Sequence, residues 1–207
     1  MTFDPWPALD AERTELADLL ESLSPAQWDN ATLCEGWRVR EVAAHLRIAG
    51  TTTARSLAAG LLRHRFDFDS WMMRAAKEGA QAPTAELAAG VRSLVGSRHK
   101  PPVVKAIDPL CDTILHAQDI RRPLGLPRVV PAAPLLAVAD HLVGNRFYKT
   151  PKRLQGLQVR MTDHAWEHGD GALVEGPGEA IVLMMTGRRA ALDDLDGEGV
   201  ATLRARC

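Results

Sequence analysis

Aromatic residues are scarce in this sequence, and neither sign of charge is in excess. Phe, Trp and Tyr make up 5% of the 207 residues, and 25 Lys and Arg residues stand against 26 Asp and Glu residues. A formal net charge of -1 leaves no global positive field that could hold a phosphate backbone. We therefore expect no nucleic acid among the partners of this protein.

Long apolar segments are also missing. No apolar run approaches the roughly 20 residues that a membrane-spanning helix requires. The opening residues, Met1-Thr-Phe-Asp-Pro-Trp-Pro, contain neither the basic nor the apolar segment of a secretory signal. The sequence therefore predicts a soluble cytoplasmic protein that has no membrane partner.

Cysteine is infrequent, and its spacing suggests no framework of disulfides. Cys34, Cys111 and Cys207 form no Cys-x-x-Cys pair, and an odd number argues against the disulfide-stapled scaffolds of small secreted domains. We interpret all three as reduced thiols. Cys34 stands just ahead of a predicted helix start, where a thiolate would be favoured, although a small packed residue is the commoner role.

Apolar residues at helical spacing are what the sequence does contain. Leu9, Leu16 and Leu20, for example, fall on one face of the first such segment. Proline and glycine interrupt the pattern at intervals that suit helix ends. We expect helices over residues 7–23, 37–62, 66–97 with an interruption near 79–83, 105–122 and 134–148.

The pattern changes after Gln155. Residues 157–163 alternate between apolar and polar side chains, Gly169-Asp-Gly171 marks a turn, and residues 172–175 follow as a second short strand, so we expect a β-hairpin. Residues 178–185 suit a helix. The sequence thus predicts a mainly α protein, with a helical bundle over residues 1–150 and a small α+β domain over residues 151–207.

Three polar residues of the segment 105–122 share one face. Asp112, His116 and Asp119 follow one another at intervals of four and three residues, which at about 100° per residue places them in one narrow sector of a helix. A carboxylate and an imidazole one turn apart can bind one metal ion from a rigid backbone. His45, at the edge of the apolar stripe of another helix, is the natural third ligand. Three protein ligands and an open position are typical of a catalytic metal.

Helical spacing alone leaves other interpretations open. An Asp and a His one turn apart commonly form a surface ion pair, and a single His at an apolar edge is commonly a core residue. Glu41, four residues before His45, offers a competing pair, and Asp119 could replace Asp112 as the carboxylate ligand. The spacing does not choose among these sets.

Two blocks of sequence together resemble a known family. Cys34-Glu-Gly-Trp37-Arg-Val-Arg-Glu-Val-Ala-Ala-His45 and Asp112-Thr-Ile-Leu-His116-Ala-Gln-Asp119-Ile-Arg-Arg-Pro-Leu-Gly125 resemble the mycothiol-dependent maleylpyruvate isomerase-like branch of the DinB superfamily. The resemblance implies a DinB-like four-helix bundle with a small C-terminal α+β domain. It also implies a divalent metal, commonly zinc, held by His45, Asp112 and His116. Asp112 stands where the characterised isomerase has Glu.

The same resemblance implies a chemistry and further site residues. Mycothiol would be the co-substrate, and its metal-bound thiolate would attack a small electrophile, giving isomerisation or S-transfer. Asp119 could orient His116 or relay a proton, and Arg188 could bind a substrate carboxylate. Trp37 and Arg122 are candidate substrate-binding residues. By analogy with DinB-type bundles, the protein could form a homodimer.

Two other functions stay open at this point. One is a regulatory or binding module that keeps the bundle and the metal or a small-molecule ligand without turnover. The other is a small-molecule carrier that needs no metal. Turnover with a panel of electrophiles separates the enzyme from the first alternative, and sensitivity of ligand binding to chelators separates it from the second.

Overall fold

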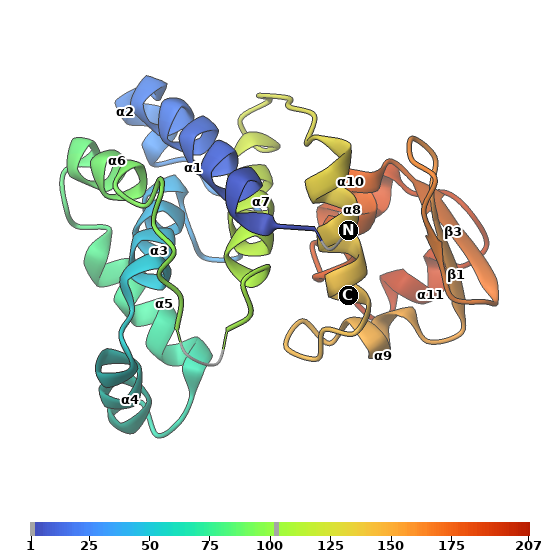
Figure 1. Ribbon diagram of the computed structural model, residues 1–207. Coiled ribbons are helices and arrows are strands. Elements are labelled where there is room, and N and C mark those ends of the chain that lie inside the picture. Colours follow the sequence, from blue (N-terminus) through green and yellow to red (C-terminus); the bar gives the residue numbers. More distant parts are fainter. Residues whose placement is uncertain (1–2, 102–103) are drawn as a thin grey trace. The chain divides into compact units, whose positions relative to one another are not determined.

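The computed structural model describes residues 3–101 and 104–207, which divide into two compact units, Met1–Pro127 and Arg128–Cys207. Most of the described residues are helical, as predicted, and a small sheet lies in the second unit (Figure 1). Our sequence analysis set the boundary at residue 150. The division by contacts falls after Pro127, because the next helix packs against a helix of the second unit.

The first unit is a helical bundle. Helix α1 packs against α6 and α7, and α3 packs against α5, α6 and α7 (Figure 1). Its buried core is aliphatic and includes Leu16, Leu20, Val42, Leu87 and Ile120. The helices are α1 (Pro5–Ser22), α2 (Pro25–Trp28), α3 (Val39–Thr51), α4 (Ala54–Arg63), α5 (Phe68–Gly79), α6 (Thr84–Arg92) and α7 (Asp108–Arg121).

The single helix predicted over residues 37–62 is wrong: the chain forms two helices, α3 and α4, in this region. The hydroxyl of Thr51 donates to the carbonyl of Arg47, and the hydroxyl of Thr52 donates to that of Ile48. Thr52 is extended, and the side chain of Thr53 caps α4. Three consecutive threonines therefore stop one helix and start the next, because their hydroxyls compete for backbone groups.

The second unit places three strands beside short helices. Strand β1 (Leu157–Met161) lies in the middle of the sheet, antiparallel to β2 (Glu167–His168) and parallel to β3 (Ala172–Gly176). The helical elements are α8 (Ala132–Val143), α9 (Thr150–Leu154), α10 (Gly178–Met185), the 3₁₀-helix η1 (Arg189–Asp194) and α11 (Val200–Arg204).

The predicted hairpin between residues 157–163 and 172–175 is wrong, because these two strands run parallel. The chain first turns back so that Glu167 pairs with Arg160, and then passes through Gly169 and Gly171 to the other edge of β1. A side chain at Gly171 would lie 2.4 Å from the carbonyl oxygen of Gly156, and φ is +122° there. Glycine therefore permits the close return that makes the parallel pair.

Helix α10 forms the centre of the second unit. It packs against α8, η1 and β1, and Ile181, Val182, Leu183 and Met184 are all buried. A helix that is apolar on all sides is covered on all sides. None of the helices described over residues 3–101 and 104–207 is both long enough and apolar enough to cross a membrane.

Candidate metal centre

Helices α3 and α7 carry the three residues predicted to bind metal. His45 lies in the middle of α3, and Asp112 and His116 lie one turn apart on α7. The two helices pack against each other. His45 and His116 are buried, whereas Asp112 is partly exposed. The first unit therefore brings together residues that are far apart in the sequence.

The ligand atoms of these residues converge. Nε2 of His45 lies 3.5 Å from Oδ2 of Asp112, and Nε2 of His116 lies 3.3 Å from Oδ1 of the same carboxylate. All three ligand atoms lie within 4.8 Å of one another, and the two imidazole centroids are 4.7 Å apart. This cluster can hold a single metal ion.

The donor set suits a divalent metal. Neither ring nitrogen of His45 forms a hydrogen bond with any of the described residues, although both nitrogens are buried. Buried polar groups are normally hydrogen-bonded, so a buried imidazole without a hydrogen bond is unusual away from a ligand site. Two imidazoles and one carboxylate are ligands that zinc and similar divalent ions prefer. The residues present therefore fit the metal that the family resemblance implies.

The charges in the cluster reinforce one another. Burial opposes ionisation of Asp112, but the positive charges of His45 and His116 outweigh burial and hold the pKa of Asp112 well below its usual range. Burial alone would lower the pKa of His116, yet the carboxylates of Asp112 and Asp119, together with Cys34, raise this pKa well above its usual value. The two shifts have the signs expected for a strong ion pair.

Asp119 meets the other edge of the His116 ring. Its Oδ2 lies 2.8 Å from Nδ1 of His116, and the residue has no exposed surface. A carboxylate can only accept, so Nδ1 of His116 donates to Asp119, and Nε2 is the nitrogen that faces Asp112. In this geometry Asp112, and not Asp119, shares the ligand cluster with His45.

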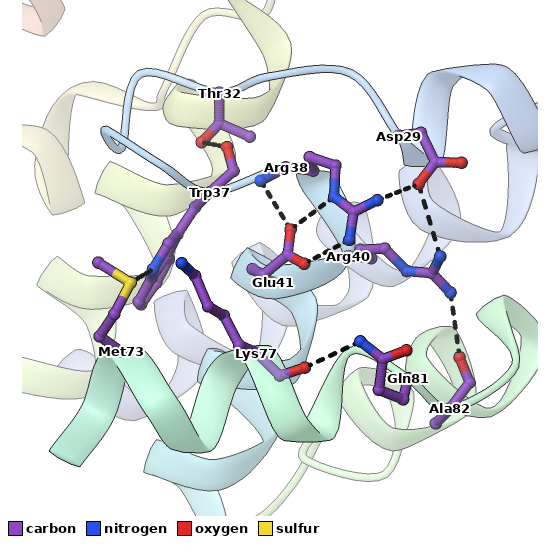
Figure 2. Close-up of polar contacts among 10 residues, drawn as sticks. All are labelled: Asp29, Thr32, Trp37, Arg38, Arg40, Glu41, Met73, Lys77, Gln81 and Ala82. Atoms are coloured by element: carbon purple, nitrogen blue, oxygen red, sulfur yellow. Dashed lines mark hydrogen bonds and ion pairs between the residues drawn. The ribbon is translucent and has the colours of Figure 1, made fainter. Parts of the chain in front are cut away.

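Glu41, the alternative carboxylate on α3, is already engaged in a cap of that helix. Its Oε2 accepts from the backbone N–H of Arg38 at 2.8 Å, and its Oε1 accepts from the guanidinium of Arg38 at 2.7 Å (Figure 2). Arg38 also pairs with Asp29 at 2.9 Å. Burial opposes ionisation of Glu41, but Arg38 outweighs it and lowers the pKa of Glu41. This carboxylate begins α3 and does not join His45.

Trp37 covers one side of the two imidazoles. Its ring centroid lies 5.1 Å from that of His45 and 6.2 Å from that of His116. The indole Nε1–H donates to Sδ of Met73 on α5 at 2.7 Å (Figure 2). Trp37 therefore lies beside the candidate ligands, and the contact with Met73 holds its ring in place. Its role in substrate binding stays a prediction.

An open groove lies beside Trp37, along α5. It has a volume of about 520 Å³ and shares Met73 with the contact to Trp37. The groove is lined by Ser70, Met73, Arg74, Lys77, Glu78 and Gln81. Sequence reasoning did not find this feature, because neither the path of α5 nor its proximity to the loop before α3 follows from helical periodicity.

Two further site residues, Arg122 and Arg188, also stay predictions. Arg122 is the partly buried residue that follows the end of α7, so it belongs to the same helix as two candidate ligands. Arg188 belongs to the second unit, where it is partly buried and precedes η1. Its role in substrate binding is proposed below.

Comparisons with known proteins agree with the architecture. Residues 9–101 match the family model described as the mycothiol maleylpyruvate isomerase N-terminal domain. No curated protein matches the sequence. The fold is similar to that of a crystal structure of the mycothiol-dependent maleylpyruvate isomerase, with a TM-score of 0.60 and 14% identity over 93% of this chain and 91% of that chain. A crystal structure of a histidine-to-alanine mutant of that isomerase gives a TM-score of 0.61 at 13% identity, with the same coverage. Residues 9–101 therefore resemble the N-terminal domain of mycothiol maleylpyruvate isomerases in sequence, and the fold resembles that of the two isomerase structures.

Proposed function

We propose that this protein is a metal-dependent enzyme that uses mycothiol as a co-substrate and acts as an isomerase or S-transferase on a small electrophile. The observation that carries the proposal is the convergence of His45, Asp112 and His116, with both nitrogens of His45 buried and unbonded among the described residues. The match to the family model supports mycothiol as the thiol.

In this proposal, His45, Asp112 and His116 hold a divalent ion such as zinc. The ion would act as a Lewis acid that favours the thiolate form of a bound thiol, which is the nucleophilic form. Asp112 contributes the negative charge of the ligand set, and its partial exposure leaves the cluster open on one side. An open side is what a catalytic centre needs and a structural one lacks.

The protein's own residues prepare this site. Asp119 accepts the Nδ1–H of His116, which directs the lone pair of Nε2 towards the cluster. Its complete burial suits an orienting role better than exchange of protons with solvent. Trp37 shields the two imidazoles, and the groove next to Met73 has room for the part of a ligand that is remote from its sulfur.

Two arginines complete the proposal. An electrophile of the maleylpyruvate kind carries carboxylates, and a guanidinium binds a carboxylate through two parallel hydrogen bonds. We assign this role to Arg188 and give Arg122 a supporting role in substrate binding. Attack of the thiolate on an activated double bond, rotation about the resulting single bond and loss of the thiolate would isomerise the substrate. Attack with loss of a leaving group would transfer the sulfur instead.

Metal analysis combined with thiol consumption tests the proposal. Protein purified without a metal-binding tag should contain one equivalent of metal, bind mycothiol and consume it with at least one member of a panel of electrophiles. His116→Ala should remove metal and thiol binding together, whereas His168→Ala, in an exposed strand of the second unit, should leave both unchanged.

Two outcomes contradict the proposal in different ways. If the protein contains no metal and His116→Ala still binds mycothiol normally, the assigned centre is not the thiol site. If the protein binds both metal and mycothiol but consumes no thiol with any electrophile, it is a binding or regulatory module of the same fold.

A further inference from the structure

Helix α4 carries an apolar ridge that the rest of the described chain leaves uncovered. Ala54, Ala58 and Leu62 follow one another every four residues, so their side chains form one row along the helix. All three are exposed, and the side chain of Leu62 is 67% exposed. Phe66, four residues further along in the turn after α4, is 73% exposed. These four residues form what we call the apolar ridge.

The contact between α4 and the bundle uses the opposite side of the helix. The main contacts of α4 are with α5. Gly60 is buried in this contact and has no room for a side chain, because an added Cβ would meet the indole ring of Trp71. Ala58 and Leu62 are each two residues from Gly60, which is about 200° around a helix. The apolar ridge therefore points away from α5, and α4 lies at one end of the first unit (Figure 1).

Three arginines accompany the apolar ridge. Arg55 and Arg63 belong to the neighbouring row of α4, and Arg65 lies in the turn that follows. All three are exposed, and none of their guanidinium groups forms an ion pair or a hydrogen bond with a residue that the structure describes. Residues 42–66 contain four arginines and no acidic residue, although the whole chain has a net charge of -1. The positive charge is therefore a local feature of this segment.

A helix with an exposed apolar side and arginines next to it is typical of segments that lie in a membrane interface. The apolar side is buried at the level of the lipid headgroups, and the cations are attracted by anionic lipids. We propose that α4 and the turn after it bind the surface of a membrane that contains anionic lipids. Leu62 and Phe66 enter the apolar layer, and the three arginines contact the headgroups.

This role goes beyond the proposed function and does not depend on a bound metal. Our expectation of no membrane partner rested on the lack of a segment that could cross a membrane. A helix that lies in the interface needs only one apolar side, and its length does not matter in the same way. The absence of a spanning helix among the described residues therefore does not oppose surface binding.

A second copy of this chain fits the apolar ridge less well than an anionic membrane does. In a two-fold contact, the same surface of each copy meets the other. The arginines beside the ridge would then approach the same arginines of the second copy, and like charges across an interface weaken binding. Anionic lipid headgroups supply the opposite charge.

Binding of the full-length protein to vesicles tests the proposal. Vesicles of phosphatidylcholine alone are compared with vesicles of phosphatidylcholine and phosphatidylglycerol, and the bound protein is measured by cosedimentation. Wild type should bind the mixed vesicles in preference to the neutral ones, and added salt should weaken this binding. Amide hydrogen exchange over residues 54–66 should become slower with the mixed vesicles only, because lipid covers the segment.

Substitutions separate the electrostatic from the apolar contribution. Arg63→Gln should weaken binding to the mixed vesicles about fivefold, as expected for one cation near an anionic surface. Leu62→Ser and Phe66→Ser should each weaken it about tenfold, because apolar surface is no longer buried in the interface. Lys152→Gln and Val129→Ser remove an exposed cation and an exposed apolar side chain from the second unit, and both should bind like wild type. Thermal unfolding verifies that each variant is folded.

Three results would overturn the proposal. The first is wild-type protein that binds neither kind of vesicle, or both equally. The second is unchanged binding of Leu62→Ser and Phe66→Ser to the mixed vesicles, since the contact would then lie on another basic surface. The third is a wild-type dimer, seen by analytical ultracentrifugation without vesicles, that Leu62→Ser dissociates. The apolar ridge would in that case be an interface between two copies.

Discussion

Helix α7 buries its polar side chains, whereas helix α4 exposes apolar ones. Thr113, His116, Gln118 and Asp119 of α7 are all buried, together with the aliphatic residues around them. Within Ala54–Arg63, only Gly60 is buried, and Leu62 is 67% exposed. A buried polar group is costly unless it is bonded. The polar residues of the candidate metal centre therefore lie in a helix whose burial makes unbonded polar groups costly. The exposed apolar residues of α4 show that apolar spacing alone does not identify the core.

Truncation of one aliphatic side chain in each helix should give the largest difference. Ile120 of α7 has no exposed surface, so Ile120→Ala should lower the free energy of unfolding by about 2–5 kcal/mol. Leu62→Ala in α4 should change it by less than about 0.5 kcal/mol. Urea unfolding followed by tryptophan fluorescence measures both. Equal losses would mean that α4 is packed in solution as firmly as α7.

The polar residues of α7 should differ in their effect on metal affinity. Asp112→Ala removes a proposed ligand and should weaken zinc binding more than the roughly 10–100-fold expected for Asp119→Ala, which removes the hydrogen bond that orients His116 but no proposed ligand. Isothermal titration with zinc, or chelator competition, measures both. The reverse order would move the metal to the edge of His116 that faces Asp119 and Cys34.

Glu41, whose buried carboxylate caps the start of α3, provides a pH-dependent test of the contrast between buried and exposed side chains. The folded-state pKa of Glu41 is below its usual value, because Arg38 outweighs the opposing effect of burial. Glu41 therefore stabilises the fold above its unfolded-state pKa, and this contribution is lost as the pH falls through its folded-state pKa. Glu41→Gln should cost about 1–2 kcal/mol near neutral pH, and the difference from wild type should shrink in acid.

An exposed ion pair supplies the control for this pH dependence. Arg74 and Glu78 pair at 3.0 Å on α5, and both side chains are 70% exposed. Glu78→Gln should change stability by less than about 0.5 kcal/mol at any pH, because solvent screens such pairs. Urea unfolding at several pH values measures both variants. A pH-independent loss for Glu41→Gln would show that its charge has no part in the cap.

The smallest effect is expected at the turn after α4. Phe66 is 73% exposed and has a φ of +66°, and Arg65 before it has a φ of +55°. Left-handed backbone costs roughly 1–2 kcal/mol for a residue with a side chain, and glycine avoids most of this cost. Phe66→Gly should therefore raise the thermal midpoint slightly, as seen by differential scanning fluorimetry. A lower midpoint would indicate that the exposed ring has packing partners in solution.

Helical spacing predicted the stripe of α7 well, because a face of a helix is a local property of the sequence. It placed Asp112, His116 and Asp119 on one side of the helix. It did not predict which edge of the His116 imidazole each carboxylate meets. That assignment depends on His45, which arrives from another helix. The site ligands therefore remain a proposal that helical spacing made possible and family resemblance made specific.

The features that sequence reasoning missed are non-local or depend on competing hydrogen bonds. The contact of Cys34 with Asp119 depends on the path of a loop without regular structure. The break between α3 and α4 depends on threonine hydroxyls that an apolar pattern does not register. In the second unit, alternation indicated strands at residues 157–163 and 172–175, but it carries no information on which strand lies next to which.

The break at Thr52 has a consequence for how the bundle opens. Segments with little buried surface open locally, at a free energy far below that of global unfolding. Amide hydrogens of α4 should therefore exchange with solvent long before those of α3, although only two residues separate the helices. A protease should also find its first cleavage site near Arg63 and Arg65, in the exposed turn that follows α4. Limited proteolysis would then release a nicked protein in which α3 and α7 still face each other.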